Sequence, residues 1–144
     1  MTPDEMKKRT KQYGLRIIRA VDSLPGTYAA RHIGGQLLRA GTSVGAKYRA
    51  ACRGRSQAEF IAKLGIVEEE CDESVYWMEL LIEAGIVPEP RLGALMKEGD
   101  EILSIVVASM NTPRGGSRST NRPRTRKSAI RNPQSPIGRK IERA

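Results

Sequence analysis

Hydrophobic side chains recur at alternating steps of three and four residues over most of residues 1–110. This spacing places them on one face of an α-helix. Short segments containing proline or glycine divide the pattern into stretches, for which we expect helices over about 2–24, 27–53, 56–85 and 90–110. No stretch makes a convincing strand. The predicted buried stripes are Met6, Thr10, Tyr13, Ile17, Ala20 or Val21, and Leu24; Ala30, Ile33, Leu37, Ala40 with Gly41, Val44, Tyr48 and Ala51; Phe60, Leu64, Val67, Cys71, Ser74 with Val75, Met78, Leu81 and Gly85; and Leu92, Leu95 with Met96, Gly99, Ile102 with Leu103, Val106 and Met110.

Local signals support the predicted helix ends. Thr2 and Glu5 have the spacing of a capping box, and Ser56 and Glu59 repeat it before the third stretch. The second stretch is unusual because it holds several glycines, each of which lowers helix propensity by up to about 1 kcal/mol relative to alanine. They indicate either close approach of a neighbouring helix or a kink near residues 41–43. These glycines are Gly34, Gly35, Gly41 and Gly45.

Loops of a few residues between long helices make sequence neighbours antiparallel. We therefore expect an all-α protein in which residues 1–110 form an up-down-up-down four-helix bundle. Some apolar residues lie off the main stripes, and they indicate either wide stripes or a second apolar face used for self-association. These residues are Ile18, Leu38, Ile61, Ile66, Ile82, Ile105 and Val107.

Residues 111–144 differ in character from the rest of the chain. They hold ten basic residues, one acidic residue, four prolines and no aromatic residue. Such a segment buries too little apolar surface to offset its ordering entropy, so we expect a disordered basic tail. Its net charge of +9 makes a polyanion the expected target. The alternative is a tail that only improves solubility.

The neutral body is itself divided by charge. Residues 1–55 hold twelve basic and three acidic residues, and residues 56–110 hold three basic and twelve acidic residues. We expect Arg39, Arg49 and Arg53 to face the acidic run 68–73 across a helix seam. The alternative is that most of these charges are solvated, because exposed ion pairs contribute only about 0–1 kcal/mol.

Catalytic chemistry finds little support. The single histidine, His32, lies within a predicted helix and cannot supply the paired motifs of a di-iron bundle. The acidic run 68–73 lacks histidine or a calcium-binding loop, and no glycine-rich segment has the pattern of a phosphate loop. Cys52 and Cys71 suit reduced thiols in a cytosolic protein. We expect no enzyme, no metal, no cofactor, no membrane span and a cytoplasmic location.

Nucleic-acid binding is the function that remains. The tail supplies charge for phosphates, and basic residues of the first two helices would shape the site. The candidate residues are Arg16, Arg19, Arg31, Lys47, Arg49, Arg53, Arg55, Arg114, Arg118, Arg122, Arg124, Arg126 and Lys127. Base stacking would be limited, because Tyr13, Tyr28 and Tyr48 are the only aromatic residues near them.

Three segments, 37–49, 56–60 and 63–70, resemble the four-helix-bundle family of 23S rRNA intervening-sequence proteins. The most specific part is the run Arg39-Ala40-Gly41-Thr42-Ser43-Val44-Gly45-Ala46, followed by Ser56-Gln57-Ala58-Glu59-Phe60. The family is similar to the accessory variability determinant of diversity-generating retroelements, a basic pentameric bundle that works with a reverse transcriptase on RNA. Lys47, Tyr48 and Arg49 depart from the usual family pattern and add positive charge.

The resemblance implies a left-handed antiparallel bundle, a ring-like homo-oligomer with five subunits, and an RNA-associated role without catalysis. We therefore expect a non-enzymatic homo-oligomer that binds nucleic acid, RNA rather than DNA, as an accessory factor to a reverse transcriptase or to an rRNA insertion element. The alternative is a protein–protein adaptor whose contact with nucleic acid is secondary.

Overall fold

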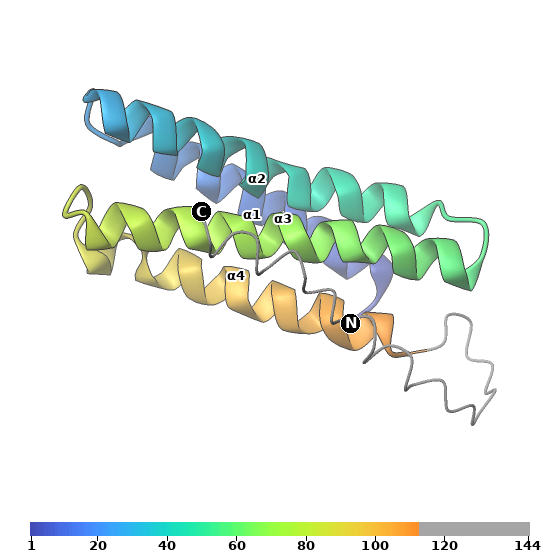
Figure 1. Cartoon of the computed structure of the whole chain (residues 1–144). Helices are drawn as coiled ribbons and strands as arrows, with labels where there is room; N and C mark the ends of the chain where they lie inside the picture. The colour runs from blue at the N-terminus through green and yellow to red at the C-terminus, as the bar shows by residue number, and fades with distance from the viewer. Residues whose placement is uncertain (113–144) are drawn as a thin grey trace, which may run out of the picture. The chain divides into compact units, whose positions relative to one another are not determined.

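A computed structural model describes residues 1–112, and these residues contain four α-helices and no strand. The helices are α1 (Pro3–Asp22), α2 (Tyr28–Cys52), α3 (Gln57–Glu83) and α4 (Glu89–Met110). They run up and down in turn, and each packs against its neighbours in the chain (Figure 1). The antiparallel four-helix bundle is confirmed. The predicted disordered tail comprises residues 111–144, and all of it from residue 113 on lies outside the described part.

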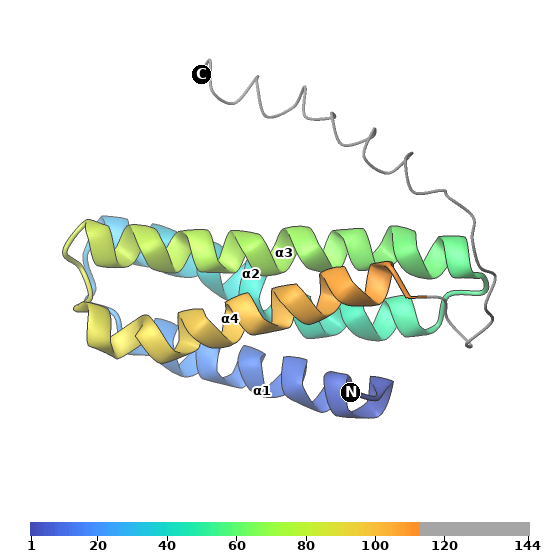
Figure 2. The same ribbon diagram turned by 90° about the horizontal axis from the view of Figure 1, so that it is seen from below.

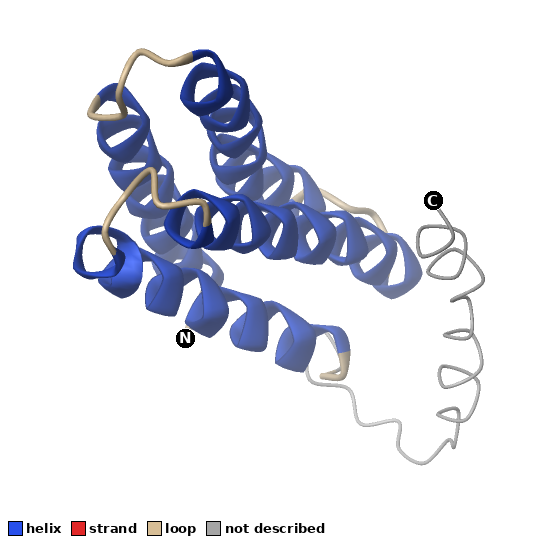
Figure 3. Cartoon of the chain, turned by 60° about the vertical axis from the view of Figure 1, so that its left-hand side comes forward, coloured by secondary structure: helices blue, strands red, loops and turns tan. Residues whose placement is uncertain are grey.

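The seams between successive helices are extensive, and the seam between α1 and α4 is the narrowest. Figure 2 shows α1 and α4 side by side along one face of the bundle. Figure 3 shows the short loops that join the helices at the two ends. Within residues 1–112, the helices lack an apolar stretch of the length that a membrane crossing needs.

The helix ends follow the predicted capping signals. The backbone N–H of Glu5 donates to Thr2 Oγ1 over 3.1 Å, and the backbone N–H of Thr2 donates to Glu5 Oε1 over 2.8 Å. The hydrogen bond from the Thr2 backbone N–H lowers the pKa of the Glu5 carboxyl. At the start of α3, Ser56 Oγ accepts from the N–H of Glu59, whose carboxylate in turn accepts from the N–H of Arg55.

The predicted stripes form one core. Tyr13, Ile17, Leu37, Met78 and Ile102 are among its largest fully buried side chains. Within the predicted stripes, some residues are half-buried rather than buried, because they lie towards the edges of the stripes or the ends of the helices, and Gly85, in the turn after α3, is exposed. The half-buried residues are Ala20, Val21, Leu24, Ile33, Phe60, Met96, Leu103 and Met110. The off-stripe residues divide between the two interpretations: Ile61, Ile82 and Ile105 are half-buried, whereas Ile18, Leu38, Ile66 and Val107 are exposed.

Two glycines of α2, Gly41 and Gly45, allow α1 to approach closely. A Cβ added at Gly41 would lie 2.7 Å from Cγ1 of Ile17, and one added at Gly45 would lie 3.4 Å from the backbone of Thr10. The helix itself runs without interruption from Tyr28 to Cys52, as one long helix, and close approach is the use of glycine that the structure shows. Close packing of α1 on α2 explains why poor helix formers occupy these positions.

A small polar network lies within the core. The hydroxyls of Tyr13 and Ser74 are 2.8 Å apart, and Ser74 also donates to the carbonyl of Cys71 over 2.7 Å. The thiol of Cys71 lies 3.3 Å from the carbonyl of Gly99. Burial raises the pKa of the Tyr13 hydroxyl above its usual value and raises the pKa of the Cys71 thiol to about 12. The network therefore joins α1, α3 and α4 in neutral form.

Candidate nucleic-acid interface

Four of the predicted binding residues lie together where α2 ends. Lys47 and Arg49 belong to the last two turns of α2, Arg53 is its C-terminal cap, and Arg55 lies in the loop before α3. All four side chains are exposed. None of them forms an ion pair with a carboxylate of residues 1–112. Their charges are therefore available to an external anion.

The other predicted residues of the body lie elsewhere. Arg16 and Arg19 belong to the second half of α1, and Arg31 lies in the first turn of α2. Eighteen residues of helix separate Arg31 from Arg49, which corresponds to about 27 Å at 1.5 Å per residue. Arg31 also donates to the carbonyl of Gly26 over 2.8 Å. The structure therefore divides the predicted site into two groups instead of gathering it into one patch.

The tail part of the prediction is outside the structural description. It comprises Arg114, Arg118, Arg122, Arg124, Arg126 and Lys127.

Fewer arginines of α2 pair with acidic residues of α3 than predicted. Arg39 donates to Glu70 over 3.0 Å and also pairs with Glu73. Arg49 and Arg53 make no such contact among residues 1–112, so their predicted pairing with the acidic run is wrong. They lie 10 and 14 residues beyond Arg39 on α2, near the start of α3, whereas the acidic run begins only at Glu68.

Arg9 forms an ion-pair clamp between α1 and α4, which sequence reasoning missed. Its guanidinium donates to both oxygens of Glu98 over 2.7 and 2.8 Å, and to Glu101 over 2.7 Å. The hydrogen bonds from Arg9 lower the pKa of the Glu98 carboxyl. The expected adjacency of α1 and α4, together with the three-residue spacing of Glu98 and Glu101, could have indicated this clamp.

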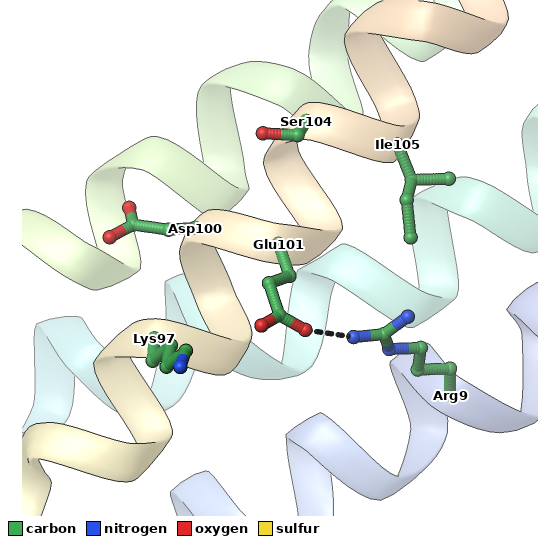
Figure 4. A pocket seen from close by; sticks show the side chains of 6 residues that line it. All are labelled: Arg9, Lys97, Asp100, Glu101, Ser104 and Ile105. Atoms are coloured by element: carbon green, nitrogen blue, oxygen red, sulfur yellow. Dashed lines mark hydrogen bonds and ion pairs between the residues drawn. The ribbon is translucent and has the colours of Figure 1, made fainter.

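A shallow hollow of about 410 Å³ lies beside this clamp. In Figure 4, Glu101 faces Arg9, while Asp100 and Ser104 point away from Arg9. Lys97 and Ile105 complete the lining. Arg9 is already neutralised by carboxylates here, and none of the predicted binding residues lines the hollow. It is therefore not part of the candidate interface.

Few side chains are suited to stacking or to metal binding. Tyr13 and Tyr48 are buried, so Tyr28, which is 80% exposed, is the one aromatic residue of α1 and α2 that a base could reach. His32 is exposed on α2. Among residues 1–112, no three His, Cys, Asp or Glu side chains are grouped in a way that could hold a metal ion.

Comparison with known proteins finds a family model that matches the sequence and a solved structure with a similar fold. Residues 4–108 match the family model of the 23S rRNA-intervening sequence protein. The chain belongs to this family. The chain is also similar to a solved structure, a protein with unknown function from the S23 ribosomal protein family of Bacteroides thetaiotaomicron VPI-5482. It is 30% identical, with a TM-score of 0.70 over 74% of this chain and 99% of that one. No curated protein matches the chain.

The matched region of the 23S rRNA-intervening sequence family contains α2 and α3 and nearly all of α1 and α4, and it ends before the basic tail. The resemblance expected from residues 37–70 is therefore confirmed for the family. Similarity to the accessory variability determinant stays a prediction. Within the matched region, Lys47, Arg49, Arg53 and Arg55 are the exposed cations that this member presents at the end of α2.

Proposed function

We propose that this protein is a non-enzymatic RNA-binding bundle. The observation that carries the proposal is the set of exposed cations at the end of α2, namely Lys47, Arg49, Arg53 and Arg55, which have no carboxylate partner within residues 1–112. The name of the family supports RNA as the nucleic acid, because it refers to an intervening sequence of 23S rRNA. The ten basic residues of the tail add to the attraction for phosphates.

The expected mode of binding is electrostatic. Lysine and arginine neutralise phosphates and release counterions, so affinity falls steeply with salt. Base recognition needs stacking platforms or side chains that read base edges, and on the first two helices only Tyr28 is an exposed aromatic residue. The protein should therefore bind RNA with little dependence on sequence. The role that the family resemblance implies is that of an accessory factor to a reverse transcriptase or to an rRNA insertion element.

Self-association belongs to the same proposal. Several large apolar side chains are exposed, among them Ile18, Leu38 and Ile66, and burial against another subunit would remove them from water. The family resemblance implies a ring of five subunits. An assembly of this kind would repeat the exposed cations around the ring and would raise affinity for a long RNA through multivalency.

The decisive experiment measures binding of a fluorescently labelled RNA hairpin to the full-length protein by anisotropy, at low and at high salt. We expect binding at low salt and a linear fall of log affinity with log salt concentration. Light scattering on the same sample measures subunit number. Absence of binding at low salt would contradict the proposal, whatever the subunit number.

A protein–protein adaptor is the second candidate. It is favoured by Tyr76, which is 49% exposed on the acidic helix α3, and by Ile66 on the same helix. A partner that co-purifies after nuclease treatment and a high-salt wash, from a protein that fails to bind RNA, would support the adaptor over the RNA-binding function.

A further inference from the structure

Charge is separated along the length of the bundle as well as between its helices. The segments 1–11, 45–67 and 102–112 meet at one end, where α1 and α3 begin and α2 and α4 finish (Figures 1 and 2). They hold nine basic and three acidic residues, and we call them the basic end. The remaining segments, 12–44 and 68–101, hold six basic and twelve acidic residues. The basic end therefore has a net charge of +6, and the rest of the bundle, its middle and its far end together, has a net charge of −6.

This polarity follows from where the acidic residues stop. On α4 the last acidic residue is Glu101, and on α3 the acidic run begins at Glu68 with only Glu59 before it. Antiparallel packing places these acid-poor helix ends beside the basic end of α2. Arg39 lies earlier on α2, outside the basic end, where it pairs with Glu70 and Glu73 and its charge is neutralised.

The cations of the basic end divide into paired and unpaired groups. Arg9 is held by Glu98 and Glu101, and Lys7 and Lys63 pair with acidic neighbours on their own helices. The remaining six are exposed and form no ion pair with a carboxylate of residues 1–112. They are Lys8, Lys11, Lys47, Arg49, Arg53 and Arg55.

The described part of the chain also finishes at this end. The side-chain amide of Gln57, in the first turn of α3, donates to the carbonyl of Thr112 over 3.4 Å. The ten basic residues of segment 113–144 are covalently joined to Thr112. The exposed aromatic residues of the bundle, Tyr28 and Tyr76, both lie in the other segments. The basic end therefore offers positive charge without an exposed ring for stacking.

We infer that the basic end is the surface that receives the phosphate backbone of RNA, and that the opposite end faces away from it. This inference rests on the proposed function. Phosphates are attracted by the unpaired cations of the basic end and repelled by the excess of carboxylates in the rest of the bundle, which lies mainly at residues 68–73 and 98–101, so the bundle should bind in one orientation. Arg16, Arg19 and Arg31, which lie outside the basic end, contribute little.

The test compares two triple variants of the full-length chain. One replaces Lys47, Arg49 and Arg53 by glutamine, and the matched control replaces Arg16, Arg19 and Arg31 by glutamine. Both remove three positive charges from largely exposed positions, so their net charges are equal. Affinity for the labelled RNA hairpin and its salt dependence are measured for each, and circular dichroism checks the fold.

We expect the Lys47, Arg49 and Arg53 variant to bind at least about tenfold more weakly than the control variant. Its slope of log affinity against log salt should be smaller by about 2, because each lost phosphate contact lowers the slope by about 0.7 to 0.9. Equal losses in the two variants would overturn the inference while leaving RNA binding intact. Failure of the unchanged protein to bind would overturn the proposed function and the inference together.

A second measurement uses the unchanged protein and needs no variant. Lysine acetylation followed by mass spectrometry compares Lys11 and Lys47, at the basic end, with the exposed Lys97 of α4. RNA should protect Lys11 and Lys47 and leave Lys97 reactive. Protection of all three would overturn the oriented surface. Equal protection by polyglutamate would overturn the assignment to RNA in favour of an acidic protein.

Discussion

At the scale of single residues, the buried contact between Tyr13 and Ser74 shows how polar groups are accommodated in this core. The Ser74 hydroxyl contacts both the Tyr13 hydroxyl and the carbonyl of Cys71. Among residues 1–112, the Tyr13 hydroxyl contacts one side chain, that of Ser74. Because a buried hydroxyl without a partner keeps its desolvation cost, the two side chains should not respond equally to removal.

We predict that Ser74→Ala destabilises the protein more than Tyr13→Phe does. The alanine leaves the Tyr13 hydroxyl buried without its partner, at a cost of about 1–3 kcal/mol, whereas the phenylalanine leaves Ser74 bonded to Cys71 and costs about 1 kcal/mol. Urea denaturation measures both free energies of unfolding. The double variant should cost less than the two single variants added together, and simple additivity would contradict the contact.

At the scale of helices, the α1–α2 seam depends on which glycines of α2 face α1. Gly41 is buried against Ile17. Gly35, six residues earlier on the same helix, is exposed, and a Cβ added there would meet nothing within 4 Å. Both residues lie inside the same helix, so alanine should improve helix propensity equally at both. Any difference in their effects therefore reports the packing of α1.

We predict that Gly35→Ala raises the free energy of unfolding by about 1 kcal/mol, the gain in helix propensity. Gly41→Ala should lower it by about 1 kcal/mol, because Ile17 must move and overpacking costs more than the propensity gain. Thermal and urea denaturation of the two variants are the measurements. If Gly41→Ala raised the free energy of unfolding instead, α1 would be able to move away from α2 without a loss of packing energy, and the prediction would be wrong.

At the scale of the whole molecule, Arg9 closes the bundle by joining its first helix to its last. The guanidinium is 25% exposed and the Glu98 side chain 18% exposed, so the pair is only partly screened by water. The hydrogen bonds from Arg9 keep the pKa of Glu98 below its usual value in the folded chain. The ionised carboxylate therefore stabilises the fold above its unfolded pKa, and this contribution disappears as pH falls through the folded pKa.

We predict that Arg9→Gln lowers the free energy of unfolding by about 1–2 kcal/mol near neutral pH and by less in acid. The loss of stability of the unchanged protein between about pH 5 and pH 3 should become shallower in the variant. Urea midpoints across this range measure the effect. Lys8→Gln is the matched control, since Lys8 is exposed and forms no ion pair within residues 1–112. An equally shallow profile in that control would contradict the clamp.

Most of the fold was predictable because local signals and apolar periodicity agree. The Thr2 and Ser56 caps marked helix starts, and positions such as Ile17, Leu64 and Ile102 are buried as their spacing predicted. The role of the α2 glycines was left open, since close approach and a kink both require small residues. Only the position of Ile17 opposite Gly41 distinguishes them.

For the candidate site, the sequence predicted which segments are rich in basic residues, but not which of those residues remain unpaired. The excess of basic residues in 1–55 correctly indicated cationic helices, yet Arg39 and Arg49 lie on the same helix and only Arg39 is neutralised. Their difference depends on which turn of α3 lies opposite each of them. Arg9 was missed because its partners are 89 and 92 residues away in the chain.

The sequence by itself determined four amphipathic helices, short connections and blocks of opposite charge, because periodicity, capping and composition are local properties. The tertiary structure alone decided which helix ends meet and which charges are neutralised. Antiparallel packing placed the acid-poor ends of α3 and α4 beside the basic end of α2, and it placed Arg9 between Glu98 and Glu101. Both results depend on the register between distant segments, which ion-pair distances and side-chain packing establish only in the folded chain.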